Sequence, residues 1–333
     1  MSCSNDNNSI PEVEQNTLSR ILVLSEGNFT KGNSDLCAIN VESDQVSEDV
    51  FRAVNNGRPL GDVGQSMAII NDKIYAVLNN SAKIEVFDAK TYKQEATILD
   101  TEKQISPRYI AKLSDKQALV TNLNNKMILI NLESNTIEKY IPTEGATEQL
   151  VVVGTKVFIA SGASILVADV NNLETLRKIE ASAGGSSKLV VDKNNKIWVI
   201  GSNGLQCIDP ATETVIKTIP LGDIRISSFA VRLETDATKS KLYFNGSKDN
   251  TDYIFEVTID ATAMPETALF ELKKEQVKTL YNIGISSEGF VYICDALDYS
   301  QRGLLHKFDT KGELLKSYTV GIIPQYILFV NNK

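Results

Sequence analysis

The chain has 333 residues, of which 42% are hydrophobic and 23% charged, a composition typical of a globular protein. Its 42 acidic and 34 basic side chains give a formal net charge of −8, so nothing suggests the clustered Lys and Arg of a nucleic-acid partner. No apolar run approaches the ~20 residues that a membrane-spanning helix requires.

The first 17 residues, MSCSNDNNSIPEVEQNT, are polar and rich in Asn and Ser, so we expect residues 1–17 to form a flexible tether. Cys3 follows a small residue and precedes this polar stretch, the pattern left when the signal peptide of a lipoprotein has been removed. We therefore expect lipidation at Cys3 and membrane attachment through that lipid alone. The alternative is an ordinary flexible N-terminus.

A short apolar β-type segment then recurs about every 40–50 residues, a period typical of propeller blades. Each copy is the second strand of a four-stranded unit and is followed by a turn-rich hairpin. In chain order the copies are ILVLSEG (21–27), KIYAVL (73–78), QALVTN (117–122), KVFIAS (156–161), KIWVIG (196–201), KLYFNG (241–246) and FVYICD (290–295).

The termini complete the count of strands. The first repeat lacks a preceding apolar strand, whereas PQYILFV (324–330) is a spare strand after the seventh repeat. Pairing these two removes the open sheet edges of a ring. The sequence therefore predicts an all-β fold over residues 18–330: one seven-bladed β-propeller with four-stranded antiparallel blades, monomeric and closed by its C-terminal strand.

Residues that carry chemistry are scarce. The one histidine, His306, and the one tryptophan, Trp198, fall inside predicted strands, and Cys37, Cys207 and Cys294 read as small buried hydrophobes. No cysteine spacing suits a metal site, and one histidine cannot supply a Ser-His-Asp set with a spare base. Asp295 and Asp298 are most simply solvated loop acids. We expect no catalytic residue, no metal and no required cofactor.

The loops between blades and those between the second and third strands share one face of a propeller. In this sequence they collect amides, arginines and aromatic side chains, which suit a large polar small molecule. The candidate ligand-binding residues are Phe29, Arg58, Gln65, Asn79, Arg108, Tyr109, Gln149, Arg225, Asn245, Tyr281 and Tyr326. In the sixth repeat the first strand is expected near Ser228.

Three features of residues 18–330 resemble the YncE-like, YVTN-type propellers found as bacterial surface lipoproteins. They are the opening SRILVLSEGNFTKGNSDLCAINVES, the repeated KIYAV and KIWVI strands, and the FDAKTYK and IDPATETVIKTIP hairpins. The opening, followed by GQSMAIINDKIYAVLNNSAKIEVFDAKT, is most similar to BtuG-type proteins. Those proteins capture cobalamin (vitamin B12) on a loop face and cap a TonB-dependent outer-membrane transporter. Similar repeats also occur in surface-layer proteins.

This resemblance implies a cell-surface lipoprotein of a Gram-negative outer membrane that binds cobalamin and passes it to a TonB-dependent transporter. Arginines would meet the ligand's phosphate, tyrosines its corrin ring, and Asn or Gln its amide arms. The alternative is a scaffold or adhesion propeller whose loop face binds another protein or an envelope polymer. An enzyme acting on glycans or quinones would need catalytic residues that the sequence does not offer.

Overall fold

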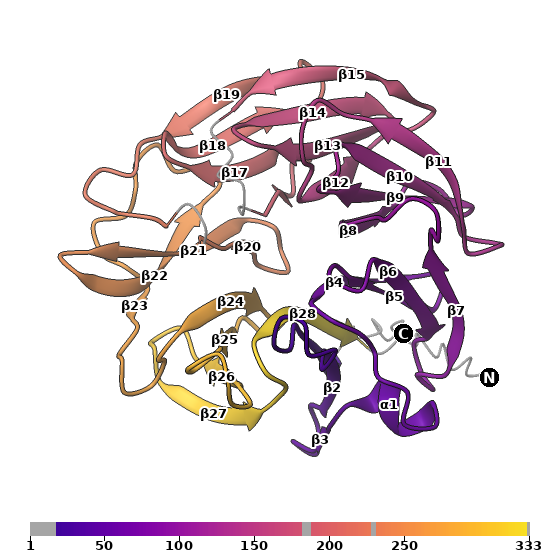
Figure 1. The fold of residues 1–333 in the computed structure, drawn as a ribbon. Coiled ribbons are helices and arrows are strands. Elements are labelled where there is room, and N and C mark those ends of the chain that lie inside the picture. Colours follow the sequence, from indigo (N-terminus) through magenta and orange to yellow (C-terminus); the bar gives the residue numbers. More distant parts are fainter. Residues whose placement is uncertain (1–17, 182–187, 228–230, 332–333) are drawn as a thin grey trace, which may run out of the picture.

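The computed structural model describes residues 18–181, 188–227 and 231–331. The expected tether and Cys3 lie outside them, as does Ser228. The strands form sheets of four arranged as a ring, which confirms the predicted seven-bladed propeller (Figure 1). The first strand of each sheet lines the centre and the fourth lies at the rim. The helix α1 (Val50–Val54) lies between blades 1 and 2, and no helix in the described residues is long and apolar enough to cross a membrane.

Blade 1 joins the two ends of the chain, because β28 pairs antiparallel with β1, with Leu22 opposite Leu328. In Figure 1 the yellow β28 lies beside the indigo strands of blade 1. The blade consists of β28 (Pro324–Asn331), β1 (Leu18–Ser25), β2 (Asp35–Asn40) and β3 (Val46–Ser47). The predicted ring closure by the C-terminal strand is therefore confirmed.

The other blades follow in chain order. Blade 2 is β4 (Gly64–Ile70), β5 (Lys73–Leu78), β6 (Lys83–Asp88) and β7 (Gln94–Leu99), and blade 3 is β8 (Pro107–Lys112), β9 (Gln117–Asn122), β10 (Lys126–Asn131) and β11 (Thr136–Pro142). Blade 4 is β12 (Leu150–Val153), β13 (Lys156–Ser161), β14 (Ser164–Asp169) and β15 (Asn172–Glu180).

Blade 5 is β16 (Val190–Val191), β17 (Ile197–Gly201), β18 (Gly204–Asp209) and β19 (Thr214–Ile219). Blade 6 is β20 (Leu233–Thr235), β21 (Lys241–Lys248), β22 (Thr251–Thr258) and β23 (Phe270–Glu271), and blade 7 is β24 (Leu280–Ile285), β25 (Val291–Asp295), β26 (Leu304–Phe308) and β27 (Leu314–Thr319).

Burial explains why the second strands read as continuous apolar runs. A blade packs between two neighbours, so both faces of its middle strands are covered and alternation disappears. In β5 every residue after Lys73 is buried, whereas the outer β7 is mostly exposed or half-buried. Each boundary between neighbouring blades holds one apolar cluster, for example Leu22 and Leu24 with Ile74 and Ala76 between blades 1 and 2.

The turns after the third strands behave as the sequence predicts. Asp88 accepts hydrogen bonds from the backbone N–H groups of Lys90 (3.0 Å) and Thr91 (2.7 Å). Asn131 and Asp209 hold the equivalent turns of blades 3 and 5. These side chains fold the blade edges locally, because a short Asp or Asn side chain bonds the backbone two or three residues on.

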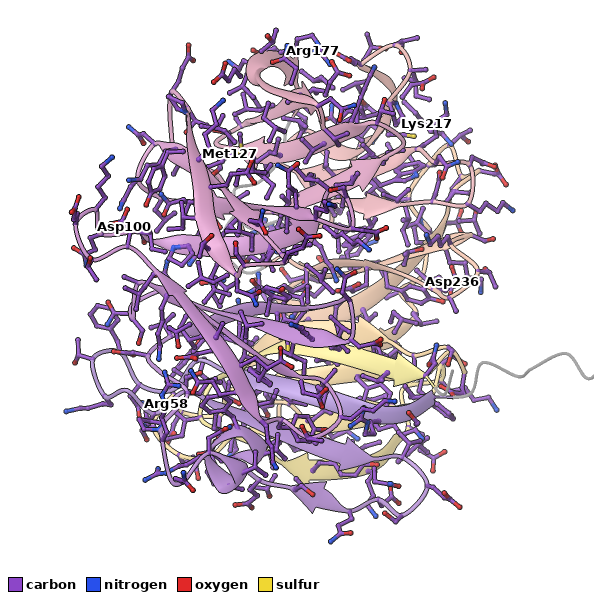
Figure 2. The ribbon with its side chains drawn as sticks, turned by 90° about the vertical axis from the view of Figure 1, so that its right-hand side faces the viewer. Arg58, Asp100, Met127, Arg177, Lys217 and Asp236 are labelled. Atoms are coloured by element: carbon purple, nitrogen blue, oxygen red, sulfur yellow. The ribbon has the colours of Figure 1, made fainter. Side chains whose placement is uncertain are left out.

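The two faces of the ring carry different connections. Figure 2 shows Arg58 and Asp100, which lie in connections between blades, on one side of the ring, and Asp236, which lies in a turn within blade 6, on the opposite side. The loop-rich face that carries the inter-blade connections is the one that holds the candidate site.

Candidate functional site

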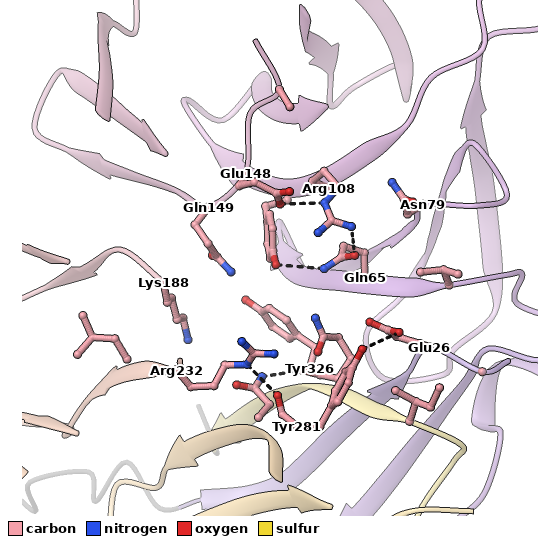
Figure 3. Close-up of a pocket in the computed structure, with 18 of the residues that line it drawn as sticks. Glu26, Gln65, Asn79, Arg108, Glu148, Gln149, Lys188, Arg232, Tyr281 and Tyr326 are labelled. Atoms are coloured by element: carbon pink, nitrogen blue, oxygen red, sulfur yellow. Dashed lines mark hydrogen bonds and ion pairs between the residues drawn. The ribbon is translucent and has the colours of Figure 1, made fainter. Parts of the chain in front are cut away.

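A cavity of about 720 Å³ opens at the centre of the loop-rich face. We call it the central pocket. Its lining comes from all seven blades and is shown in close-up in Figure 3. Its charged, amide and aromatic side chains include Glu26, Gln65, Asn79, Arg108, Tyr109, Glu148, Gln149, Lys188, Arg232, Glu234, Tyr281, Gln325 and Tyr326.

Irregular pairing at the start of the first strands points side chains into this pocket. The ladder between β4 and β5 skips Gln65, and the one between β8 and β9 skips Arg108 and Tyr109. The ladder between β24 and β25 skips Tyr281, and that between β28 and β1 skips Gln325. A β-bulge re-aims a side chain and is common beside functional sites. Four blades thus use the same local device.

Arg108 is fixed on one side of the pocket by two neighbours. Its Nε donates to Glu148 Oε2 at 2.8 Å, and its Nη1 donates to Gln65 Oε1. Gln65 in turn donates from Nε2 to the Tyr109 hydroxyl at 3.1 Å. Figure 3 shows Arg108 between Glu148 and Gln65, with both contacts as dashed lines. Burial raises the pKa of the Glu148 carboxyl, and the charge of Arg108 opposes that shift.

The opposite side of the pocket holds Arg232, Tyr281 and Glu26. Arg232 Nε donates to the Tyr281 carbonyl at 2.8 Å, and its guanidinium lies 5.9 Å from the centre of the Tyr281 ring. The Tyr281 hydroxyl donates to Glu26 Oε2 at 3.0 Å. Burial raises the pKa of Glu26, partly offset by this hydrogen bond.

Lys188 and Glu234 form a second ion pair of the pocket, after Arg108 and Glu148. The Lys188 ammonium donates to Glu234 Oε1 and lies 5.9 Å from the centre of the Tyr326 ring. Burial acts to lower the pKa of Lys188, but the charges of Glu234 and Tyr326 outweigh it and the net shift is upward. The lining thus carries three cations (Arg108, Lys188, Arg232) and three carboxylates (Glu26, Glu148, Glu234), which compensate one another.

The structure gathers many of the predicted binding residues at this pocket. Those that line it are Phe29, Gln65, Asn79, Arg108, Tyr109, Gln149, Tyr281 and Tyr326. Tyr109 forms part of the floor, because it is only 8% exposed and belongs to the apolar cluster between blades 3 and 4. Phe29 stands at the rim and is 70% exposed.

Arg58 lies elsewhere, which corrects its placement at the central rim. Phe51 of α1 contacts Phe87 with ring centres 5.1 Å apart, which holds this connection against blade 2. Arg58 Nη2 consequently reaches Glu85 of β6 at 2.6 Å and Thr97 of β7 at 3.2 Å. It covers the outer part of blade 2 and does not line the central pocket.

Arg225 and Asn245 also lie away from the central pocket. They line a separate cavity of about 290 Å³ over blade 6, together with side chains of the connection to blade 7. Asn245 Oδ1 accepts a hydrogen bond from the backbone N–H of Arg232 at 2.7 Å, so Asn245 supports a pocket residue without lining the pocket.

Sequence reasoning missed Arg232 and Glu234 because it placed the first strand of blade 6 too early. The strand is β20 (Leu233–Thr235), a few residues after Ser228. Counting back from the apolar strand KLYFNG, as in the other repeats, would have found VRLET. Glu26, Glu148 and Lys188 were also missed, because a charged loop residue alone gives no signal of where it points.

Residues that were set aside as structural do lie in the blades. His306 is 2% exposed, with Nδ1 2.8 Å from Ser317 Oγ and Nε2 3.4 Å from Asp295 Oδ2. Asp295 is not the solvated loop acid that the sequence suggested: it is 0% exposed at the end of β25 and accepts from the backbone N–H groups of Lys278 and Thr279, so it anchors a loop. Within the described residues no cluster of His, Cys, Asp and Glu could hold a metal ion.

Fold and pocket together define a seven-bladed propeller with one central, charge-compensated cavity. The chain belongs to the family described as a domain of unknown function (DUF5074), whose model matches residues 20–321. A comparison with curated proteins finds no match.

Solved structures share the fold at low sequence identity. A quinonprotein alcohol dehydrogenase-like protein from Bacteroides thetaiotaomicron has a TM-score of 0.71 at 15% identity, covering 93% of this chain and 78% of that one. The periplasmic gluconolactonase PpgL of Pseudomonas aeruginosa has a TM-score of 0.67 at 14% identity, covering 94% and 99%. A protein from Lactobacillus plantarum gives the same TM-score, identity and coverage as PpgL. These similarities show the propeller architecture and nothing about activity.

Proposed function

We propose that the central pocket captures a large, polar, overall neutral small molecule without changing it chemically. The observation that carries this is the compensated lining, in which blades 1, 3, 4, 5 and 6 contribute three cations and three carboxylates. A strongly charged ligand would leave one half of these charges buried and unpaired, which is costly. A neutral molecule with many donors and acceptors meets no such penalty.

Cobalamin is the specific ligand of this proposal. It presents amide arms, a phosphate and a flat corrin with apolar edges, and its negative phosphate is balanced by its cationic metal centre. Asn79 and Gln149 offer amides, Arg108 and Arg232 offer guanidinium groups, and Tyr281 and Tyr326 offer aromatic surface. The resemblance of the N-terminal strands to BtuG-type proteins supports the same ligand.

The proposal needs no covalent step. Each carboxylate of the pocket already contacts a cation or a tyrosine hydroxyl. Such contacts suit recognition, since they fix the direction of donors and acceptors before the ligand binds. The role proposed here is therefore binding and not catalysis.

Delivery to a TonB-dependent outer-membrane transporter and anchoring at the cell surface through Cys3 belong to the same proposal. Their support is the sequence resemblance and the polar stretch that follows Cys3. A pocket open on one face is compatible with such a transfer, because a partner that covers that face could receive the ligand directly.

The test is calorimetric titration of the protein with cyanocobalamin, with cobinamide, which lacks the nucleotide arm, as the comparison. We expect one-to-one binding of cyanocobalamin and weaker binding of cobinamide. Arg108→Ala should weaken cyanocobalamin binding at least about tenfold, which corresponds to about 1.4 kcal/mol.

Arg58→Ala is the matched control. Arg58 also pairs with a carboxylate, Glu85, but lies outside the pocket, and Lys83 still contacts Glu85 when Arg58 is removed. The Arg58→Ala variant should bind cyanocobalamin as tightly as the wild type. Melting curves check that both variants remain folded. An absence of binding heat with the wild type would exclude cobalamin as the ligand. Recovery of a stoichiometric protein partner from envelope extract would then favour the scaffold function.

A further inference from the structure

The second cavity on the loop-rich face has a built frame of its own. We call it the outer pocket and define it by Arg225, Ser227, Asn245, Asp252, Lys274 and Lys278. Its volume is about 290 Å³. It lies over blade 6 and the connection to blade 7, and none of these residues belongs to the lining of the central pocket.

Blade 6 forms this pocket because its middle hairpin is longer than those of the other blades. β21 and β22 have 8 residues each, against 6 for β5 and β6. The tight turn between them uses Asp249 and Asn250 at φ values of 51° and 63°, which short polar residues tolerate. The extra residues extend the hairpin at its β21–β22 turn, on the loop-rich face.

The two segments beside this hairpin are held in place, one by the hairpin itself and the other by blade 7. Arg225 and Ser247 exchange two backbone hydrogen bonds of 2.8 Å each, which ties the connection from blade 5 to the end of β21. On the other side, the backbone N–H of Lys278 donates to Asp295 Oδ2 at 2.8 Å. The backbone that carries Arg225 and Lys278 is therefore fixed, although their side chains are exposed.

The charges of the outer pocket are not compensated. Three cations, Arg225, Lys274 and Lys278, face one carboxylate, Asp252. Lys274 Nζ lies 2.6 Å from Asp252 Oδ2. Within the described part of the chain, neither Arg225 nor Lys278 forms an ion pair. A local excess of positive charge in a protein of net charge −8 contrasts with the neutral central pocket.

We propose that the outer pocket is a second binding site, separate from the central pocket, for a small molecule that carries an anionic oxygen group, phosphate or carboxylate. Arg225 and Lys278 contact the anion, and Asn245 and Ser227 face the rest of the molecule. Because the cations are exposed, the contribution of each contact is small and screened by salt. The site therefore binds weakly and selects for charge.

The test is an NMR titration of the full chain, following backbone amide shifts, with glucose 6-phosphate as the phosphate probe and glucuronate as the carboxylate probe. Glucose is the neutral match. We expect saturable shifts centred on Ser247 and Lys278 with one or both anionic probes, none with glucose, and at least tenfold weaker binding when the salt concentration is raised tenfold.

The variant Arg225→Gln with Lys278→Gln should weaken that binding at least tenfold. Lys90→Gln with Lys311→Gln removes the same charge from turns on the opposite face and should leave it unchanged, and so should Arg108→Ala in the central pocket. The proposal is overturned by an absence of saturable shifts, by equal shifts with glucose, or by equal weakening in the control pair. None of these outcomes bears on cobalamin binding at the central pocket.

Discussion

The side chains of the central pocket are held by their own partners, so little order has to be gained when a ligand binds. Arg108 is fixed by Glu148 and Gln65, and Gln65 is fixed by Tyr109. Immobilising a free side chain at an interface costs about 0.5–1.5 kcal/mol, and prior contacts reduce this cost. The geometry of single residues thus favours recognition by a preformed surface.

Asp35 shows a residue whose burial works against stability. Burial raises its pKa from 3.8 to about 6, reinforced by the charge of Asp49. A carboxyl whose pKa is higher in the folded than in the unfolded state stabilises the fold at low pH. That contribution is lost as the pH rises through the window between the two values, here from about 4 to about 6.

Asp35→Asn removes this titration. Relative to the wild type, the variant should gain stability between pH 4 and pH 7, by at most about 3 kcal/mol, since one pKa unit corresponds to about 1.4 kcal/mol. Urea unfolding of both proteins at the two pH values measures the difference. A gap between the two proteins that does not change with pH would contradict the assigned shift.

At the scale of elements, the start of the first strand decides what faces the pocket. The bulges that leave Gln65, Arg108 and Tyr281 out of the ladders occur at the N-terminal end of β4, β8 and β24. Bulges leave a weak trace in a sequence because they depend on the partner strand. This is why the loops, and not the exact pocket lining, could be read from the sequence.

Close packing between blade 7 and β28 gives a test at this scale. A Cβ on Gly303 would lie 2.5 Å from Pro324 Cδ and 2.7 Å from the Asp295 carbonyl oxygen. Gly303→Ala should therefore destabilise the protein by about 1–3 kcal/mol through overpacking. The midpoint of thermal unfolding, followed by circular dichroism, measures the effect.

Gly145→Ala is the control for that variant. The nearest atom to its new Cβ would be Ser161 Oγ at 3.9 Å, and neither glycine has a left-handed φ. Its melting temperature should stay within a degree or two of the wild type. Equal melting temperatures for the Gly303 and Gly145 variants would show that the start of β28 is not tightly packed against blade 7.

At the scale of the whole molecule, repetition made the fold predictable. Each blade can be recognised in the sequence from one apolar strand and its turns, so an error in one repeat does not change the number of blades that is predicted. The first strand of blade 6 was misplaced near Ser228, yet the ring of seven blades is correct. Strand counting is robust because neighbouring blades bury equivalent clusters.

The site was harder to predict because it depends on the lengths of individual connections. Helix α1 carries Arg58 outward to Glu85, and the long hairpin of blade 6 gives Arg225 a pocket of its own. Neither feature repeats, so neither could be inferred from the other blades. Arg108, whose connection to blade 2 is short, lies at the central pocket as expected.

Ring closure by β28 links the termini to the pocket, and it can be broken at one residue. Ile327 of β28 is paired with Val23 of β1, and Gln325 and Tyr326 of the same strand line the pocket. β28 is the inner edge strand of blade 1, and Ile327→Pro would put a proline, which has a fixed φ and no N–H, into the middle of its ladder with β1. An unpaired buried group costs about 1–3 kcal/mol, so we expect the melting temperature to fall by about 5 °C or more. Because the pocket depends on all blades, ligand binding should be lost with it.

Leu315→Pro is the control, since Leu315 lies on the outer edge strand β27, is 44% exposed and is absent from the ladder with β26. If both proline variants melt together with the wild type, β28 does not hold the ring closed. If only Ile327→Pro loses stability and binding together, the C-terminal strand both closes the propeller and shapes its binding face.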